Sequence, residues 1–335
     1  MRYSLVELAP VAPGGTKREA LDRALTAAEE AEHLGFHRFW FAEHHHVTGY
    51  AAQDPVALIA AAAQRTSRIR LGSGAVLLNH YSAFSVAERF LMLESLAPGR
   101  VDLGLGRATA TPLIDHALRR DRNSRPADDF PDQVQEIIGY LHKAFHGAHP
   151  FAAIDLTAGT DGIPEVWVLG SSGASAGLAA RLGIGYTFGG HINPDLAARA
   201  LRHYREGFTK TPSGTGAAQP MLALNIVAAA DEASAHRLTW PARALRAGGR
   251  DRPIPTLEQA RAELSAAAKA QPSTIVDGAV PPQISGTPAT LRAQLVPVIK
   301  ESGATEVMVQ DMLTDFDART RSRQIVAEVL ESITI

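Results

Sequence analysis

The chain has 335 residues and no cysteine, which excludes a disulfide scaffold, a thiolate metal site and a cysteine nucleophile. Its formal net charge of −2 argues against nucleic acid or a membrane surface as the main partner. The apolar run at 5–11 is interrupted by Glu7 and Pro10, so it does not form a signal peptide, and no stretch reaches the roughly 18 apolar residues of a membrane span. We therefore expect a cytoplasmic globular protein.

Strand and helix patterns alternate along the chain. Short apolar runs predict strands at 3–7, 38–43, 69–78, 101–106, 166–170, 186–189, 221–229 and 306–310. Helical spacing and capping signals predict helices at 17–34, 54–66, 82–96, 171–182, 194–208, 233–246, 287–302 and 318–332. Eight strands, each with a helix, predict an α/β fold closed as a (β/α)8 TIM barrel, and the alternative is an open doubly wound sheet.

Two segments are longer than the loops of a minimal barrel. Residues 107–164 follow the fourth strand and carry one helical pattern at about 129–145. Residues 247–285 follow the seventh strand and carry a helical pattern at about 256–270. Long insertions after barrel strands often act as lids or specificity loops, although they can also be ornaments. We expect one barrel domain over 1–335 with insertions after strands 4 and 7.

The second predicted strand ends in Glu43, His44, His45 and His46. Residues at this end of a barrel strand face the active site, and alternation would point His44 and His46 one way and His45 the other. Neighbouring residues on a strand chelate one ion poorly and no HExxH spacing is present, so we expect no metal site. An imidazole can donate, accept or take up a proton near neutral pH, which favours catalysis over a structural hydrogen bond.

Glycines occupy two positions of the third predicted strand, Gly72 and Gly74. Glycine weakens a strand and often marks the close approach of a ligand. A flat aromatic ring could lie against this bare strand, and the alternative is tight packing of an outer helix.

The fourth predicted strand ends in Gly104 and Gly106, followed by Arg107. The third glycine of a dinucleotide fingerprint is missing and no helix follows at once, so this motif does not indicate a nicotinamide site. An arginine just past a barrel strand suits an anionic ligand, and a surface ion pair is the alternative.

The fifth predicted strand leads into a helix through small polar residues. Amides at a helix N-terminus and small hydroxyl side chains form an anion site, for which phosphate is the usual ligand. The alternative is that the serines merely cap the helix. The candidate phosphate ligands are Ser171, Ser172, Gly173 and Ser175, together with Arg107.

The ordered set of motifs resembles the bacterial-luciferase-like family of flavin monooxygenases over nearly the whole chain. Each motif is modest by itself, and their order carries the resemblance. The matching stretches are WFAEHH at 40–45, LGSGAVLL at 71–78, GRVDLGLGR at 99–107, VLGSS at 168–172, AARLG at 179–183, SGTP at 285–288 and GATEVMV at 303–309.

The resemblance implies FMN as the cofactor, in reduced form as a co-substrate. It implies that Gly74 and Ala75, often joined in this family by a non-prolyl cis peptide, lie under the isoalloxazine ring. It implies that His44, with Glu43 and His45 beside it, acts near the reacting edge of the flavin. Reduced flavin and O₂ would form a peroxyflavin that passes one oxygen atom to a small organic substrate, in a pocket that excludes water.

Three weaker candidates for the substrate pocket are His46, Asn79 and His80. His46 stands where the family usually has an apolar residue, which leaves the substrate open. The resemblance also implies a homodimer and a separate flavin reductase as partners, with no nucleic acid or membrane partner. Two other functions remain open: a deazaflavin-dependent oxidoreductase of the same fold that transfers hydride, and a flavin-binding protein without turnover.

Overall fold

The computed structural model describes residues 1–108, 110–118, 129–249, 252–276 and 278–334. Parts of both predicted insertions therefore lie outside the described residues.

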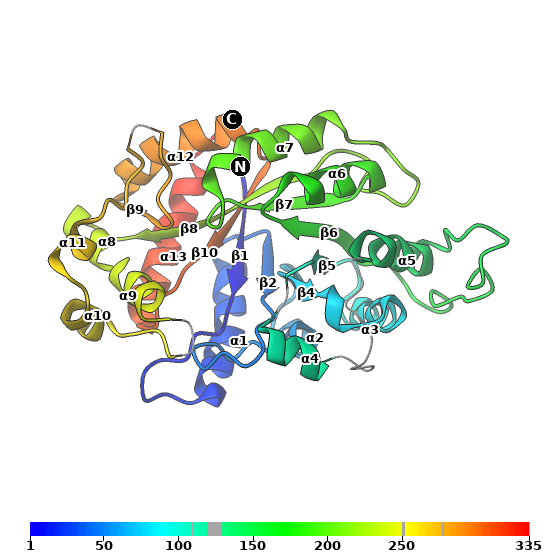
Figure 1. The fold of residues 1–335 in the computed structure, drawn as a ribbon, viewed down its shortest axis with the longest axis horizontal. Coiled ribbons are helices and arrows are strands. Elements are labelled where there is room, and N and C mark those ends of the chain that lie inside the picture. The colour runs from blue at the N-terminus through cyan, green and yellow to red at the C-terminus, as the bar shows by residue number, and fades with distance from the viewer. Residues whose placement is uncertain (109, 119–128, 250–251, 277, 335) are drawn as a thin grey trace.

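Eight strand positions form a closed ring of parallel strands (Figure 1). β10 pairs with both β1 and β8, which closes the ring, and β3 and β4 share one position beside β5. The predicted (β/α)8 TIM barrel is confirmed, and the chain is not an open sheet. The ring consists of β1 (Arg2–Glu7), β2 (Arg38–Phe41), β3 (Arg70–Ser73), β4 (Val76–Leu77), β5 (Val101–Gly106), β6 (Glu165–Gly170), β7 (Gly185–Gly189), β8 (Pro220–Ala228) and β10 (Glu306–Gln310).

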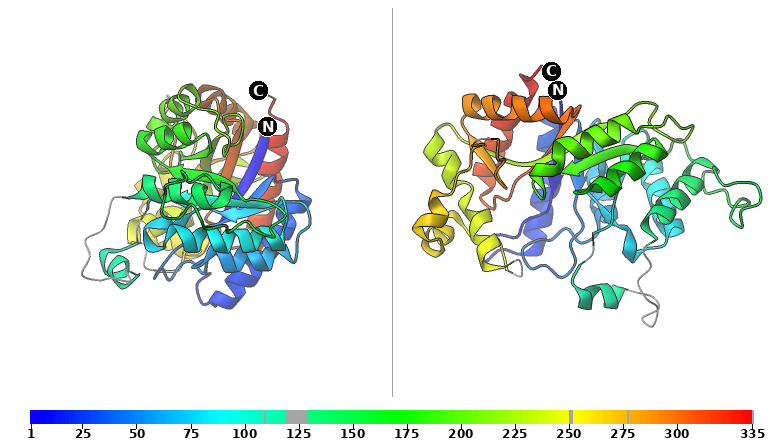
Figure 2. Two further views of the ribbon diagram at one scale, coloured as in Figure 1. Left: turned by 90° about the vertical axis from the view of Figure 1, so that its right-hand side faces the viewer. Right: turned by 45° about the horizontal axis from the view of Figure 1, so that its top comes forward.

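Helices surround the barrel, and the two chain ends lie together beside the start of β1 (Figures 1 and 2). Side chains satisfy the first helical amides: Thr16 forms a capping box with Glu19, and Asp54 accepts from the amide of Val56. The surrounding helices are α1 (Lys17–His33), α2 (Pro55–Ala63), α3 (Ala83–Leu96), α5 (Phe130–His142), α6 (Gly173–Leu182), α7 (Ala197–Glu206), α12 (Pro288–Ser302) and α13 (Phe316–Glu331).

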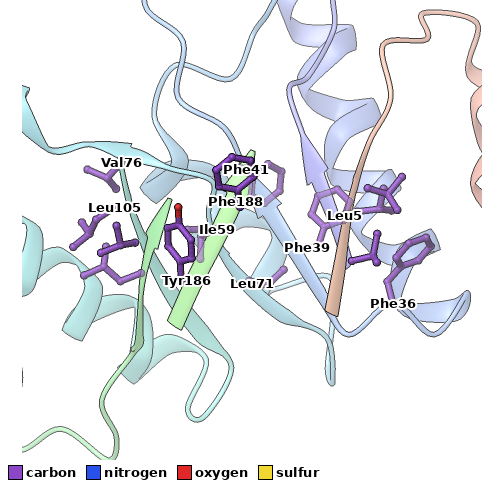
Figure 3. Packing of buried hydrophobic residues seen from close by; sticks show 14 of the residues in the cluster. Leu5, Phe36, Phe39, Phe41, Ile59, Leu71, Val76, Leu105, Tyr186 and Phe188 are labelled. Atoms are coloured by element: carbon purple, nitrogen blue, oxygen red, sulfur yellow. The ribbon is translucent and has the colours of Figure 1, made fainter. Parts of the chain in front are cut away.

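Alternation along the strands divides the buried side chains into two layers. Leu5, Phe39 and Leu71 point outward and pack beneath the helices (Figure 3). Trp40 and Trp167 point inward, where their rings meet edge to face at 5.5 Å between centroids. The barrel interior is thus filled by side chains in its middle layer.

The amino-terminal layer of the barrel interior is charged. Arg38 is 1% exposed and donates to Asp102 at 2.9 Å and to Glu306 at 3.1 Å. Arg70 reinforces Asp102 at 2.6 Å, and Trp40 donates to its other oxygen at 2.8 Å. This end of the barrel is filled by paired charges, and active sites of such barrels lie at the opposite, carboxyl end of the strands.

The strands next to the site differ from prediction. β2 ends at Phe41, two residues early, because the His44 amide leaves the ladder and donates to Ala52. The third predicted strand is broken at Gly74, beyond which the chain forms β4 and then a short 3₁₀ helix at Leu78–His80.

Two predicted helices are each divided in two. The helix predicted at 233–246 is α8 (Glu232–Arg237) and α9 (Trp240–Gly248), with Pro241 in the first turn of α9. Proline has no N–H to donate to the carbonyl of Arg237 four residues earlier, so the ladder of helical hydrogen bonds is interrupted there. The helix predicted at 256–270 is α10 (Leu257–Glu263) and α11 (Ala266–Ala270), because Ser265 caps a new helix.

Both insertions lie where the sequence predicts them, after the fourth and seventh barrel strands. The first contains α4 (Pro112–Leu118), which was not predicted and stands away from the barrel in Figure 2. The second contains β9 (Ile284–Gly286), also not predicted, which pairs with the part of β8 that extends past the ring.

Candidate active site

Small residues occupy inward positions at or just past the carboxyl ends of several strands. They are Ala42, Gly74, Gly106, Gly189 and Ala223. A Cβ placed on Gly74 would lie 3.0 Å from Val6 and 3.3 Å from Cβ of Trp40, so the layer directly below is packed. We call the carboxyl end of the barrel, beyond this packed layer, the mouth.

One side of this mouth is bare backbone. Gly74 and Ala75 are joined by a cis peptide bond between β3 and β4. The amide of Gly74 donates to Phe41 at 2.8 Å, and a Cβ on Gly106 would lie 3.1 Å from Cβ of Ala75. We call residues 74–75 the ledge. Glycine and alanine place no large side chain of their own on this surface.

Gly72 serves a different purpose. A Cβ there would lie 2.7 Å from Cδ1 of Trp40 and 2.6 Å from the carbonyl oxygen of Asp102, both inside the barrel. This glycine makes room for the interior layer. It does not lie against an outer helix, so that sequence interpretation is wrong for this position.

His44 lies on the inner side of the mouth. Its ring packs against Tyr50 at 4.7 Å between centroids, and Tyr50 belongs to the apolar cluster inside the barrel. His46 is exposed with a left-handed backbone, φ 54°. Because β2 ends at Phe41, the predicted strand alternation does not extend to these histidines.

Glu43 precedes His44 in the chain and is almost fully buried, with 4% exposure. Its carboxylate accepts from Nε2 of His45 at 2.6 Å, from the Tyr81 hydroxyl at 3.0 Å and from the Leu77 amide at 3.2 Å. Burial raises the pKa of Glu43, and the three hydrogen bonds oppose that shift only in part. Glu43 thus ties β2 to β4 and orients His45.

The remaining pocket candidates lie at the exit of β4. The side-chain amide of Asn79 donates to the carbonyl of Arg107 at 3.0 Å, which joins the exits of β4 and β5. The ring of His80 meets that of His45 edge to face at 5.8 Å and lies 3.5 Å from Asp115 in α4. His80 therefore connects the rim to the first insertion.

The phosphate candidates lie at adjacent strand ends. Gly106 is paired with Leu169, so exposed Arg107 and the start of α6 follow neighbouring strands. Ser172 is the N-cap of α6, but its side chain makes no capping bond, and a Cβ on Gly173 would meet open space. The first amides of this helix are therefore accessible to an anion.

Ser175 is held within the protein. Its hydroxyl donates to the Ser172 carbonyl at 2.9 Å and lies 3.2 Å from the Tyr186 hydroxyl, which donates to the same carbonyl at 3.1 Å. A Cβ on Gly170 would collide with the Ser175 hydroxyl, which explains the glycine. Ser175 shapes the turn and keeps lone pairs for a further donor.

Sequence reasoning missed several residues of this region. Tyr81 and Asp115 bind named candidates, but each lies in a segment without a strand or motif signal. His191 follows β7. Burial lowers its pKa, the hydrogen bond to the Ala223 carbonyl opposes this shift, and Arg246 adds to it. Its position after a barrel strand was the signal that could have identified it.

Within the described residues, no cluster of histidine, aspartate and glutamate side chains could hold a metal ion. Across that same part of the chain, no helix is long and apolar enough to cross a membrane.

The closed parallel barrel, with a polar rim at the carboxyl ends of its strands, defines a (β/α)8-barrel enzyme. The sequence pattern of the luciferase-like monooxygenases matches residues 1–306. The chain belongs to this family of flavin-dependent oxidoreductases.

Two relatives are similar over almost the full length. The uncharacterized protein YceB of Bacillus subtilis is 34% identical over 331 residues, covering 98% of this chain and 99% of the relative. A luciferase-like monooxygenase of Escherichia coli K12 is 33% identical over 335 residues, covering 99% and 97%.

Solved structures share the fold. Apo-MsnO8 has a TM-score of 0.88 at 34% identity, covering 100% of this chain and 99% of that one. The oxygenating constituent of a diketocamphane monooxygenase from Pseudomonas putida, in complex with FMN, has a TM-score of 0.71 at 20% identity with the same coverage. An F420-dependent secondary alcohol dehydrogenase has 0.64 at 15%, also with that coverage. At these identities, the last two structures show the shared fold.

Proposed function

We propose that this chain is an FMN-dependent monooxygenase that uses reduced FMN and O₂ to oxygenate a small organic substrate. The observation that carries the proposal is the ledge at 74–75, beside the open start of α6 and Arg107. The ledge would offer a flat apolar surface, and the start of α6 with Arg107 would offer an anion site, which are the two recognition elements that FMN requires.

The phosphate group of FMN would be held by the first amides of α6, by Ser171 and Ser172, and by Arg107. The amides and the helix dipole favour a negative charge. A guanidinium adds charge-assisted hydrogen bonds. Ser175 would contribute mainly through the turn that it holds in place. A direct contact of its hydroxyl with the phosphate has less support than those of the other residues.

When bound, reduced FMN supplies two electrons, so that one oxygen atom of O₂ can enter the substrate and the other can leave as water. The residues of this chain would exclude water and manage one proton. His44 is the imidazole on the inner side of the mouth, so we assign it the proton exchange at the reacting edge. Glu43 holds His45 by a 2.6 Å contact, which makes Glu43 a positioning residue.

FMN is favoured over a deazaflavin by the relatives. The relative named as a monooxygenase is 33% identical to this chain over almost its full length, whereas the F420-dependent structure is 15% identical and shares the fold alone. A hydride-transferring deazaflavin enzyme is therefore the second candidate.

A separate reductase would deliver reduced FMN, because no GxGxxG fingerprint for a nicotinamide occurs in the sequence. We further propose a homodimer in the cytoplasm. Met92 and Leu96 lie one helical turn apart on α3 and are 54% and 49% exposed, an apolar surface that a second copy would cover.

Oxygen uptake tests the proposal. Purified protein is supplied with reduced FMN from an added reductase, and dissolved O₂ and peroxide are measured with and without candidate substrates. We expect a substrate to increase O₂ consumption and to lower the peroxide released per O₂. Oxygen consumption identical to that of free reduced FMN, with every substrate, would refute a monooxygenase.

A further inference from the structure

Two amide side chains lie beside the mouth where β8 leaves the ring. β8 pairs with β7 up to Ala223 and with β10 up to Asn225, and its last residues pair with β9. Asn225 lies two residues beyond Ala223 and therefore on the same inward face of β8. Gln283 immediately precedes β9. The register Ile226 to Ile284 places these two side chains next to each other.

Both side chains are buried with polar atoms that have no partner. Gln283 is 4% exposed, and neither its oxygen nor its nitrogen makes a hydrogen bond. Asn225 is 6% exposed; its nitrogen donates to the Pro282 carbonyl at 3.0 Å, while its oxygen has no partner. Leaving such groups unpaired is costly, and buried polar atoms of native proteins almost always have a partner.

The side chains on the opposite face of these two strands are packed, and the next side chain on the same face of β9 already has a hydrogen-bond partner. Ile226 and Ile284 pack into the outer apolar layer. Ser285, which shares the face of Gln283, binds the Ser273 hydroxyl of the second insertion at 2.7 Å. Ser273 of the insertion therefore pairs with Ser285, whereas no group among the insertion's described residues pairs with the unpartnered atoms of Asn225 and Gln283.

The chemistry of the unpaired atoms defines that group. The Asn225 orientation is fixed, because its nitrogen faces a carbonyl; its oxygen therefore needs a donor. Gln283 offers both a donor and an acceptor. A ligand that satisfies both side chains would donate and accept at neighbouring atoms, as a carboxamide does. An ester or a carboxylate has no hydrogen to donate.

We propose that Asn225 and Gln283 form the substrate-selecting contact of this enzyme and recognise a carboxamide group of the substrate. The inference rests on the proposed function for the reaction, since it adds the substrate class to the same mouth. The amide N–H would donate to Asn225, and the amide carbonyl would accept from Gln283. An apolar part of the substrate would lie toward the ledge.

The test is binding of three matched probes to the full chain, measured calorimetrically with and without FMN. N-hexylacetamide carries the amide, hexyl acetate lacks only the N–H, and heptanoate carries a charge. We expect N-hexylacetamide to bind about tenfold more tightly than hexyl acetate, the scale of one buried hydrogen bond. Asn225→Leu should abolish that difference, because it removes the acceptor for the N–H. Gln283→Leu should weaken both probes alike, because both carry the carbonyl to which Gln283 would donate.

Gln219→Leu is the matched control. Gln219 also carries a buried side-chain oxygen without a partner, but it precedes β8 at the other end of the barrel. This variant should keep the amide preference. Gln283→Leu should melt no earlier than the wild type, because an unpaired amide replaced by an apolar group of similar size loses no hydrogen bond.

Equal binding of amide and ester by the wild type, tighter binding of heptanoate, or no binding of any probe would each overturn the inference. FMN affinity, followed by flavin absorbance in the same samples, reports separately on the proposed function. Loss of FMN binding with a retained amide preference would refute the flavin site alone.

Discussion

Replacing Arg38 tests how the barrel interior is held together. The guanidinium is 1% exposed and serves Asp102, Glu306 and, at 3.5 Å, Glu165. Arg38→Met keeps much of the apolar volume but leaves buried carboxylates short of a counter-charge. Removing one partner of a buried ion pair typically costs about 3–5 kcal/mol. We expect a loss of this size in the free energy of unfolding at pH 7.

The loss should depend on pH. In the wild type, burial alone would raise the pKa of Asp102, but Arg38 and then Arg70 hold it below its ordinary value. Asp102 therefore contributes stability above its unfolded pKa, and this contribution fades as the pH falls. Without Arg38 that folded pKa rises, so protonation relieves the unpaired charge, and the difference between variant and wild type should shrink below about pH 5.

The assay is urea denaturation at pH 7 and pH 4.5, followed by tryptophan fluorescence and by circular dichroism. Arg2→Met is the control, because Arg2 lies 3.6 Å from the same Glu306 but its side chain is 43% exposed. It should cost at most about 1 kcal/mol. An Arg38→Met loss no larger than that of the control, or one that does not change with pH, would refute the reasoning.

Three further predictions concern the mouth. Arg107→Ala should weaken FMN binding by about 1–3 kcal/mol in a flavin titration, whereas Arg181→Ala, at the far end of α6, should not; equal affinities would remove Arg107 from the phosphate site. His44→Ala should keep FMN affinity but lower the product formed per O₂ consumed, and unchanged coupling would contradict its role. Gly72→Ala should lower the unfolding free energy by about 1–3 kcal/mol in thermal melts, because its methyl group would lie 2.7 Å from Trp40; an unchanged melting temperature would show that the interior yields.

The barrel was predictable because its signals are local and repeated. Apolar runs and helix caps recur along the chain, and the pair Leu-Gly follows two helices just before a strand, at Leu34-Gly35 and Leu182-Gly183. The break in the third strand was not visible in periodicity, since its apolar residues continue to Leu78. Only the resemblance indicated a cis peptide at Gly74, and the structure contains it.

The site was predictable where strand ends alone position residues. Arg107 and Ser172 follow neighbouring strands, and their proximity follows from barrel order. The partners of other candidate residues come from segments distant in sequence: Asp115, in α4, lies beside His80, which follows β4. The unpaired amides of Asn225 and Gln283 could not be predicted, because β9 has no sequence signal of its own.

The most direct test of the central claim is anaerobic titration of the protein with reduced FMN, followed by rapid mixing with oxygenated buffer in a stopped-flow spectrometer. We predict saturable binding of reduced FMN, and then a transient absorbance that precedes the spectrum of oxidised flavin. Failure to bind reduced FMN, together with binding and oxidation of a reduced deazaflavin by hydride transfer, would contradict the account and establish the second candidate.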